Sequence, residues 1–252
     1  MNMAARTVQR GPQATMSDRR GTAIDLPIGP RLPDELLARA RQLPRKPDPV
    51  TLAGSHVHLA PLDLARDAEP LHRVSNGSPI ALGERRVDAY DADAAIWRYI
   101  PGGGPFAGAE ELAAHLRSQV EAANGLCLCV FDVRSGVQVG VVNYMNNYPE
   151  HLKVELGNIW YSPVVQRTGA NTEATYLLLR HAFALGYRRV EWKCDALNER
   201  SRRAALRLGF TFEGIQECHF IVKGRNRDTA WFRILDREWD DVRRRLESLL
   251  AP

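Results

Sequence analysis

The chain has 252 residues, of which 44% are hydrophobic and 25% are charged, and this excludes a fully disordered, collagen-like or disulfide-scaffold protein. No run approaches the roughly 18 consecutive apolar residues that a membrane helix needs, so we expect no membrane partner. The net charge of +4 is confined to residues 1–50, where nine Lys/Arg face five Asp/Glu (9 − 5 = +4), and residues 51–252 balance at 25 − 25 = 0.

The first part of the chain differs in composition from the rest. Residues 1–50 hold seven of the fifteen prolines and are rich in arginine. We predict a disordered extension over residues 1–50, with one short helix over residues 34–42, and a folded domain over residues 51–252. Because this domain carries no net basic charge, we expect it to bind no nucleic acid directly.

The elements of the folded domain follow from hydrophobic periodicity and turn residues. We expect helices over residues 61–72, 106–123 and 171–185, a helix from Asn198 to Gly209, and a closing helix over residues 239–250. We expect strands at residues 57–59, 126–133, 137–144, 153–161, 188–194, 210–222 and 229–235, with residues 76–93 irregular. This order predicts a mixed α/β or α+β domain.

The four cysteines do not suggest a metal site or a disulfide framework. They are Cys127, Cys129, Cys194 and Cys218, with no C-x-x-C pair and no histidine cluster at zinc spacing. We interpret them as small buried side chains in a reducing compartment, which favours a cytoplasmic protein without a metal.

The most informative stretch runs from the strand that ends at Tyr161 into the helix over residues 171–185. The connecting loop contains Gln166 and Gly169, and the helix begins with N-T-E-A at Asn171. Backbone N–H groups at the start of a helix have no intrahelical partner, and the helix dipole adds positive charge there, so such a loop can hold a phosphate. An ordinary strand-to-helix loop explains this stretch alone equally well.

A second stretch, residues 191–214, contains further motifs that help to interpret the loop. It contains N-x-x-S (Asn198, Ser201) and then L-G-F-x-x-E-G from Leu208. With the Q-x-x-G-x-N-T-E-A signal from Gln166, these motifs resemble the GNAT superfamily of acetyl-CoA-dependent N-acetyltransferases. The resemblance is to the branch of the RimJ/RimL ribosomal-protein N-terminal acetyltransferases, and it extends over roughly residues 50–240.

The resemblance implies a GNAT fold over residues 51–252. This is a mixed, mostly antiparallel sheet of about seven strands flanked by helices, splayed between the fourth strand, residues 154–161, and the fifth, residues 189–194. In the family, acetyl-CoA fills the gap with its pantetheine arm and places its pyrophosphate on the loop. The cofactor-binding positions implied here are Ile159, Tyr161, Gln166, Arg167, Thr168, Gly169, Ala170, Asn171, Thr172 and Asn198. The sequence departs from the family pattern at Asn171, which we expect to cap the helix.

The resemblance also implies transfer of an acetyl group to a primary amine by direct attack, with a protein N-terminus or a small molecule as acceptor. Glu155 matches the position of a general base in this branch, although an ordinary strand carboxylate would look the same. Ser201 is a candidate acid, because Ala205 stands where many relatives carry a tyrosine; a first-turn helix serine is the alternative. A homodimer is compatible with the sequence.

Three aromatic residues flank the G-G-G run at residues 102–104. Trp97, Tyr99 and Phe106 can form a wall of the acceptor pocket, or they can belong to the core. Arg225, Arg227 and Asp228 can also lie on the acceptor side, or they can hold a hairpin turn. Two other functions stay open: a GNAT-like module that senses acyl-CoA without turnover, and a ribosome-associated binding protein that uses its basic N-terminal segment.

Overall fold

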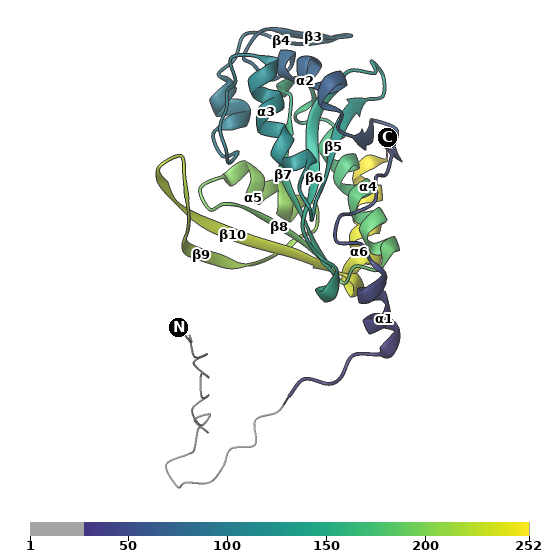
Figure 1. Ribbon diagram of the computed structural model, residues 1–252. Coiled ribbons are helices and arrows are strands. Elements are labelled where there is room, and N and C mark those ends of the chain that lie inside the picture. Colours follow the sequence, from purple (N-terminus) through teal and green to yellow (C-terminus); the bar gives the residue numbers. More distant parts are fainter. Residues whose placement is uncertain (1–27, 252) are drawn as a thin grey trace, which may run out of the picture. The chain divides into compact units, whose positions relative to one another are not determined.

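The computed structural model describes residues 28–251, so residues 1–27 of the predicted extension lie outside the described part of the chain. The predicted helix over residues 34–42 is present as α1 (Asp34–Gln42). The compact unit considered below begins at Glu35. Figure 1 shows its helices and strands.

The centre of this unit is an eight-stranded sheet with the order β1-β2-β5-β6-β7-β8-β10-β9. Its strands are β1 (Leu52–Ala53), β2 (Val57–Pro61), β5 (Leu126–Asp132), β6 (Gln138–Tyr148), β7 (Lys153–Tyr161), β8 (Arg189–Asp195), β9 (Thr211–Val222) and β10 (Arg225–Leu235). Neighbouring strands are antiparallel except β7 and β8, which are parallel. The mixed, mostly antiparallel sheet is therefore confirmed, with eight strands rather than about seven because the two-residue β1 adds an edge.

A second, two-stranded sheet corrects the prediction that residues 76–93 are irregular. It consists of β3 (Ile80–Leu82) and β4 (Arg85–Val87), joined through Gly83, whose φ is +61°. Ile80 and Leu82 are buried against the main core. Strands this short give too little alternation to be recognised from sequence, and tertiary packing stabilises them.

Five further α-helices belong to this unit. They are α2 (Leu64–Arg73), α3 (Ala109–Val120), α4 (Ala170–Leu185), α5 (Glu199–Arg207) and α6 (Trp239–Leu250). The helix predicted over residues 61–72 begins later, because Pro61 is the last residue of β2 and the Asp63 carboxylate accepts the Ala65 and Arg66 N–H groups at 2.9 and 3.2 Å. Asp63 is thus the N-cap. The helix predicted over residues 106–123 is shorter by three residues at each end.

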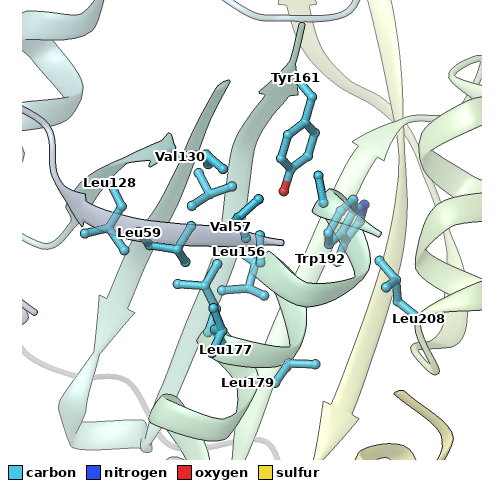
Figure 2. Packing of buried hydrophobic residues seen from close by; sticks show 14 of the residues in the cluster. Val57, Leu59, Leu128, Val130, Leu156, Tyr161, Leu177, Leu179, Trp192 and Leu208 are labelled. Carbon is cyan, nitrogen blue, oxygen red and sulfur yellow. The ribbon is translucent and has the colours of Figure 1, made fainter. Parts of the chain in front are cut away.

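Two layers of helices cover the sheet and create two cores. One face packs against α4 and α6, and its core contains Leu156, Leu177 and Trp192 (Figure 2). The other face packs against α2 and α3, and its core contains Trp97 and Leu116. Fully burying one such side chain contributes about 1.5–3 kcal/mol to folding, so both faces hold the sheet firmly. Alternation along β7 and β8 then decides which side chains reach each face.

Candidate functional site

Strands β7 and β8 separate part-way along their length. They pair in register from Lys153 with Arg189 to Leu156 with Trp192, and no pairing continues beyond that point. β7 runs on to Tyr161, so five of its residues have no partner strand on the side of β8. The splayed sheet that the resemblance implied is therefore confirmed.

A bulge in β7 marks the place where the strands part. Gly157 pairs with Asn143 and Trp160 with Val141, so β7 holds one extra residue there, and Asn158 has a φ of +46°. The Ser162 N–H bonds to the Val139 carbonyl of β6 at 2.8 Å. Because bonding directions alternate in an antiparallel ladder, the backbone groups of Tyr161 and Ile159 point away from β6 and into the gap.

A cavity of about 360 Å³ occupies this gap. It is lined from β7 and β8, from α5, from the loop after Trp97 and from the β9–β10 hairpin. Alternation places Cys194 on the face of α4 and α5, and Glu155 and Lys193 on the opposite face. The cavity therefore connects the two faces of the sheet.

Glu155 is the buried carboxylate of this cavity, with 3% of its surface exposed. Its Oε2 lies 2.9 Å from Lys193 Nζ and accepts a hydrogen bond from Asn146 Nδ2 at 2.8 Å. Burial raises the pKa of Glu155, and the Lys193 charge and the Asn146 amide partly oppose this rise. A carboxyl group with a raised pKa at the edge of a cavity is a candidate for proton transfer.

Asn198 and Ser201 line the same cavity from the start of α5. The Asn198 side chain caps this helix, as predicted, by accepting the Ser201 N–H at 3.1 Å. The Ser201 hydroxyl accepts a hydrogen bond from Trp192 Nε1 at 3.0 Å. Its own hydrogen is therefore available to the cavity or to Cys194. Burial raises the pKa of the Cys194 thiol, and the Ser201 hydroxyl partly opposes this rise.

The loop before α4 contains the predicted phosphate-binding positions. Gln166 turns its amide back to the Tyr161 carbonyl at 2.9 Å and the Ala95 carbonyl at 3.3 Å. Arg167 has a φ of +63°, and the Thr168 hydroxyl accepts the Ala170 N–H at 3.2 Å. Within the described residues, the N–H groups of positions 167–169 have no hydrogen-bond partner, so the loop keeps free backbone donors.

Gly169 lies close to the exposed side chain of His56. A Cβ at this position would lie 2.9 Å from the His56 ring. The N-cap of α4 is Gly169, so the prediction that Asn171 caps the helix is wrong. Asn171 lies inside the first turn, where its Oδ1 accepts a hydrogen bond from Thr175 Oγ1 at 3.4 Å. Thr172, the next residue, is buried and accepts a hydrogen bond from Arg207 at 2.7 Å.

Glu173 has a structural role that the sequence did not indicate. Its buried carboxylate accepts the backbone N–H groups of Ser55, His56 and Val57 at 2.7, 2.6 and 2.7 Å. Gly54 packs so closely on this carboxylate that a Cβ there would lie 2.4 Å from it. Glu173 thus fixes the start of β2 against the first turn of α4.

Only one of the three aromatic candidates lines the cavity. Tyr99 does so, and its hydroxyl donates to the Leu197 carbonyl at 3.2 Å. Trp97 is fully buried in the core under α2 and α3, where Phe106 packs edge-on against it at 5.0 Å. Trp97 and Phe106 are therefore core residues rather than a pocket wall.

Three further polar residues line the cavity: Arg227, which the sequence allowed on the acceptor side or in the hairpin turn, and Lys193 and Asn146, which were not identified from the sequence. Strand pairing brings them together from β8, β6 and β10. Lys193 and Asn146 match none of the quoted motifs. Only the alternation of β8, which puts Lys193 on the same face as the candidate base on β7, could have suggested Lys193. Among residues 28–251, no group of three or more His, Cys, Asp or Glu side chains is placed to hold a metal ion.

The family described as "Acetyltransferase (GNAT) domain" matches residues 79–211, which is more than half of the chain and includes the bulged strand, the loop and α5. The chain belongs to the GNAT acetyltransferase family. A crystal structure of a GCN5-related N-acetyltransferase from Brucella melitensis is similar to this GNAT chain with a TM-score of 0.72 and 35% identity, over 82% of this chain and 87% of that one.

One further relative bears on the branch of the GNAT family, and one further structure bears on the fold. The "Putative ribosomal N-acetyltransferase YdaF" of Bacillus subtilis (strain 168) is 30% identical over 42% of this chain, and the match spans 57% of that protein, a little over half its length. This similarity agrees with the predicted RimJ/RimL branch. A structure of RimL, a ribosomal L7/L12 α-N-protein acetyltransferase in complex with coenzyme A, shares the fold with a TM-score of 0.58 and 18% identity. None of the described helices is long and apolar enough to cross a membrane.

Proposed function

We propose that this GNAT chain is an N-acyltransferase that transfers an acetyl group from acetyl-CoA to a primary amine in a ternary complex. The observation that carries the proposal is the cavity between β7 and β8, where an open strand edge, the start of α5 and the buried carboxylate of Glu155 meet. Membership of the family supports the coenzyme and the class of reaction.

The residues of the gap fit a coenzyme A arm. The backbone groups of Ile159 and the N–H of Tyr161 point to a side where no strand pairs with them, whereas the Tyr161 carbonyl already accepts the Gln166 amide. Unpaired backbone groups inside a fold need a partner. Asn198 lines the cavity, and its Nδ2 is free within the described residues because the cap uses Oδ1. A pantetheine amide offers both donors and acceptors to these groups.

The loop before α4 fits the pyrophosphate of the coenzyme. The N–H groups of Arg167, Thr168 and Gly169 are free within the described residues, and the positive end of the α4 dipole lies beside them. The Arg167 guanidinium has no partner there either, whereas Arg200 bonds to the Ala94 and Ala95 carbonyls and Arg207 to Thr172. Arg167 is therefore the arginine available for a phosphate.

Glu155, Ser201 and the free N–H groups of β7 each move a proton or stabilise charge during the reaction. When bound, the coenzyme supplies an acetyl thioester. A protein N-terminus has a pKa near 7.7–8.0 and must lose a proton before it can attack. Glu155 accepts this proton, directly or through water, and the Ser201 hydroxyl donates to the sulfur side of the cavity. The N–H groups of Ile159 and Tyr161 would donate to the thioester oxygen, which becomes negatively charged when the amine attacks.

Acetyl-CoA binding and thiol release test this proposal separately. Calorimetry with the full chain should show acetyl-CoA binding that weakens in Asn198→Ala, with Asn226→Ala on the β9–β10 hairpin as a matched control. Addition of primary amines should then release free thiol in proportion to the amide formed. Acetyl-CoA binding without thiol release from any amine would identify a sensor instead, and absence of acetyl-CoA binding would refute the proposal.

A further inference from the structure

Arg227 is a cationic side chain of the cavity with no anionic partner. It comes from β10 and contributes to the same lining as Glu155. No carboxylate of the described residues lies within 4 Å of its guanidinium, and its Nε is buried without a hydrogen bond. Its described contact is with the Phe220 ring, whose centroid lies 5.5 Å from the guanidinium carbon.

The other charges of the cavity have partners in the protein. Lys193 neutralises Glu155 at 2.9 Å and lies over the Trp231 ring at 4.8 Å. Asp195 accepts the Leu197 N–H at 2.8 Å. The guanidinium of Arg227 is thus the one cavity charge, among the described residues, that pairs with no opposite charge or hydrogen-bond acceptor.

An unpaired guanidinium in a cavity destabilises the fold, and it favours binding of an anionic ligand. A buried polar N–H without a partner loses its hydration, and the aromatic contact with Phe220 compensates only one face of the planar group. The guanidinium edge matches a carboxylate, which can accept two parallel hydrogen bonds from it. A carboxylate on a bound molecule would therefore gain more here than an uncharged group.

The position of Arg227 assigns this carboxylate to the acceptor. Arg227, Thr229 and Trp231 follow one another at every second position of β10, and the register shift between Arg227 and Thr229 comes from additional residues in β9, between Gln216 and Phe220. The three side chains therefore lie on one face, and Lys193 over Trp231 shows that this is the face of Glu155. The coenzyme loop and α5 lie with the opposite face, beside Cys194 and Trp192. Arg227 and Glu155, the proposed base, line the same cavity, so one bound molecule can contact both.

We propose that the acceptor amine carries a carboxylate, which Arg227 binds while the amine faces Glu155. This inference rests on the proposed function. The carboxylate can be the α-carboxylate of a free amino acid or the acidic side chain of a peptide N-terminal residue, and the chemistry at Arg227 is the same.

The test compares matched acceptors with and without the carboxylate, using saturating acetyl-CoA and thiol release. One arm pairs L-alanine with L-alaninamide, and the other pairs Asp-Ala-Ala-amide with Asn-Ala-Ala-amide. In at least one arm, wild type should release thiol faster with the carboxylate acceptor than with its uncharged match. The ratio of the two rates should be about 10- to 100-fold smaller in Arg227→Gln. Comparing the preference between the two proteins cancels differences in the pKa of the acceptor amines.

Controls separate specificity from folding. Arg225→Gln, an exposed residue at the start of the same strand, should retain the wild-type preference. Arg227→Lys keeps the charge without the paired donors and should retain a smaller preference. Arg227→Glu should favour acceptors with a second positive charge, such as lysinamide over alaninamide.

Two results would overturn the inference while leaving the proposed function intact. One is equal turnover of both members of each pair by wild type, and the other is an unchanged preference in a folded Arg227→Gln or Arg227→Lys protein. Acetyl-CoA binding without turnover of any acceptor would instead refute the proposed transferase function.

Discussion

Replacement of Glu155 by glutamine tests the proposed proton transfer with little change in shape. Glutamine fills the same volume and can still accept the hydrogen bond from Asn146, but it cannot take a proton. Glu191→Gln is a matched control. Glu191 is the register partner of Glu155 on β8, is also buried, and is paired with Arg189 at 2.7 Å and with Lys153 at 3.4 Å. It does not line the cavity.

The expected loss of rate follows from the role of a general base. A positioned base contributes about 10²- to 10⁴-fold, so we expect kcat of Glu155→Gln to fall by that factor, which is about 2.7–5.5 kcal/mol in the barrier. Both variants break an ion pair, which costs about 3–5 kcal/mol when the pair is fully buried. Lys193 and Lys153 keep 15% and 29% exposure, so we expect about 3 kcal/mol or less in each case.

The pH dependence gives a second signature. Since only the ionised carboxylate accepts a proton, the rate of wild type should rise with pH through the raised pKa of Glu155. The raised pKa of Glu155 also makes the stability of the fold depend on pH, but stability should fall where the rate rises. A carboxyl group with a folded pKa above the unfolded value of about 4.5 stabilises the fold at low pH, and this contribution is lost as pH rises through the folded pKa. Glu155→Gln should lack both dependences.

Single-turnover thiol release from saturated complexes between pH 5 and 9 measures the rate, and urea unfolding at the same pH values measures stability. The pH dependence of the rate that remains in Glu155→Gln should reflect the titration of the acceptor amine. A Glu155→Gln protein that keeps the wild-type rate and the acidic limb, or a Glu191→Gln protein that loses rate equally, would refute the role of Glu155 as base.

Three further substitutions test the packing around the site by urea unfolding. Tyr161→Phe should keep stability or gain up to about 1 kcal/mol, because the buried hydroxyl has no partner among the described residues; a loss above 1 kcal/mol would contradict this. Glu173→Gln should lose about 2–4 kcal/mol, since an amide NH₂ would face one of three bound backbone N–H groups, and a loss below 1 kcal/mol would show that the loop does not depend on the carboxylate. Gly169→Ala should lose up to about 1 kcal/mol and weaken acetyl-CoA binding, because the exposed His56 ring must move. His56→Ala in the same chain should restore part of both, and two losses that simply add would contradict this contact.

Local sequence patterns were sufficient for the elements that surround the site. The apolar spacing of residues 171–185 and the final glycine predict α4, and Gly186 ends it with a φ of +89°. Asn198 predicts the start of α5 because its side chain bonds to a backbone group three residues away. The gap between the strands followed from the resemblance to the family, which rests on motifs that lie close together in the chain.

Roles that depend on distant segments required the tertiary structure. The sequence placed Glu173 in a first helical turn, but its partners lie more than 110 positions earlier in the chain. Trp97 and Tyr99 are two residues apart and have the same aromatic character, yet one is a core residue and the other lines the cavity. Periodicity in a sequence does not say which neighbouring element a side chain will meet.

Lys193 and Arg227 show the physical reason most clearly. In sequence, Lys193 is an ordinary charged residue of a strand, and Arg227 is equally compatible with the acceptor side and with a hairpin turn. Pairing of β8 with β7 and with β10 brings these cations to the cavity of Glu155, and burial then makes the presence or absence of a counter-charge significant. Local sequence determines helices, caps and turns because those hydrogen bonds join near neighbours, whereas burial and charge pairing are decided by strand register across the whole sheet.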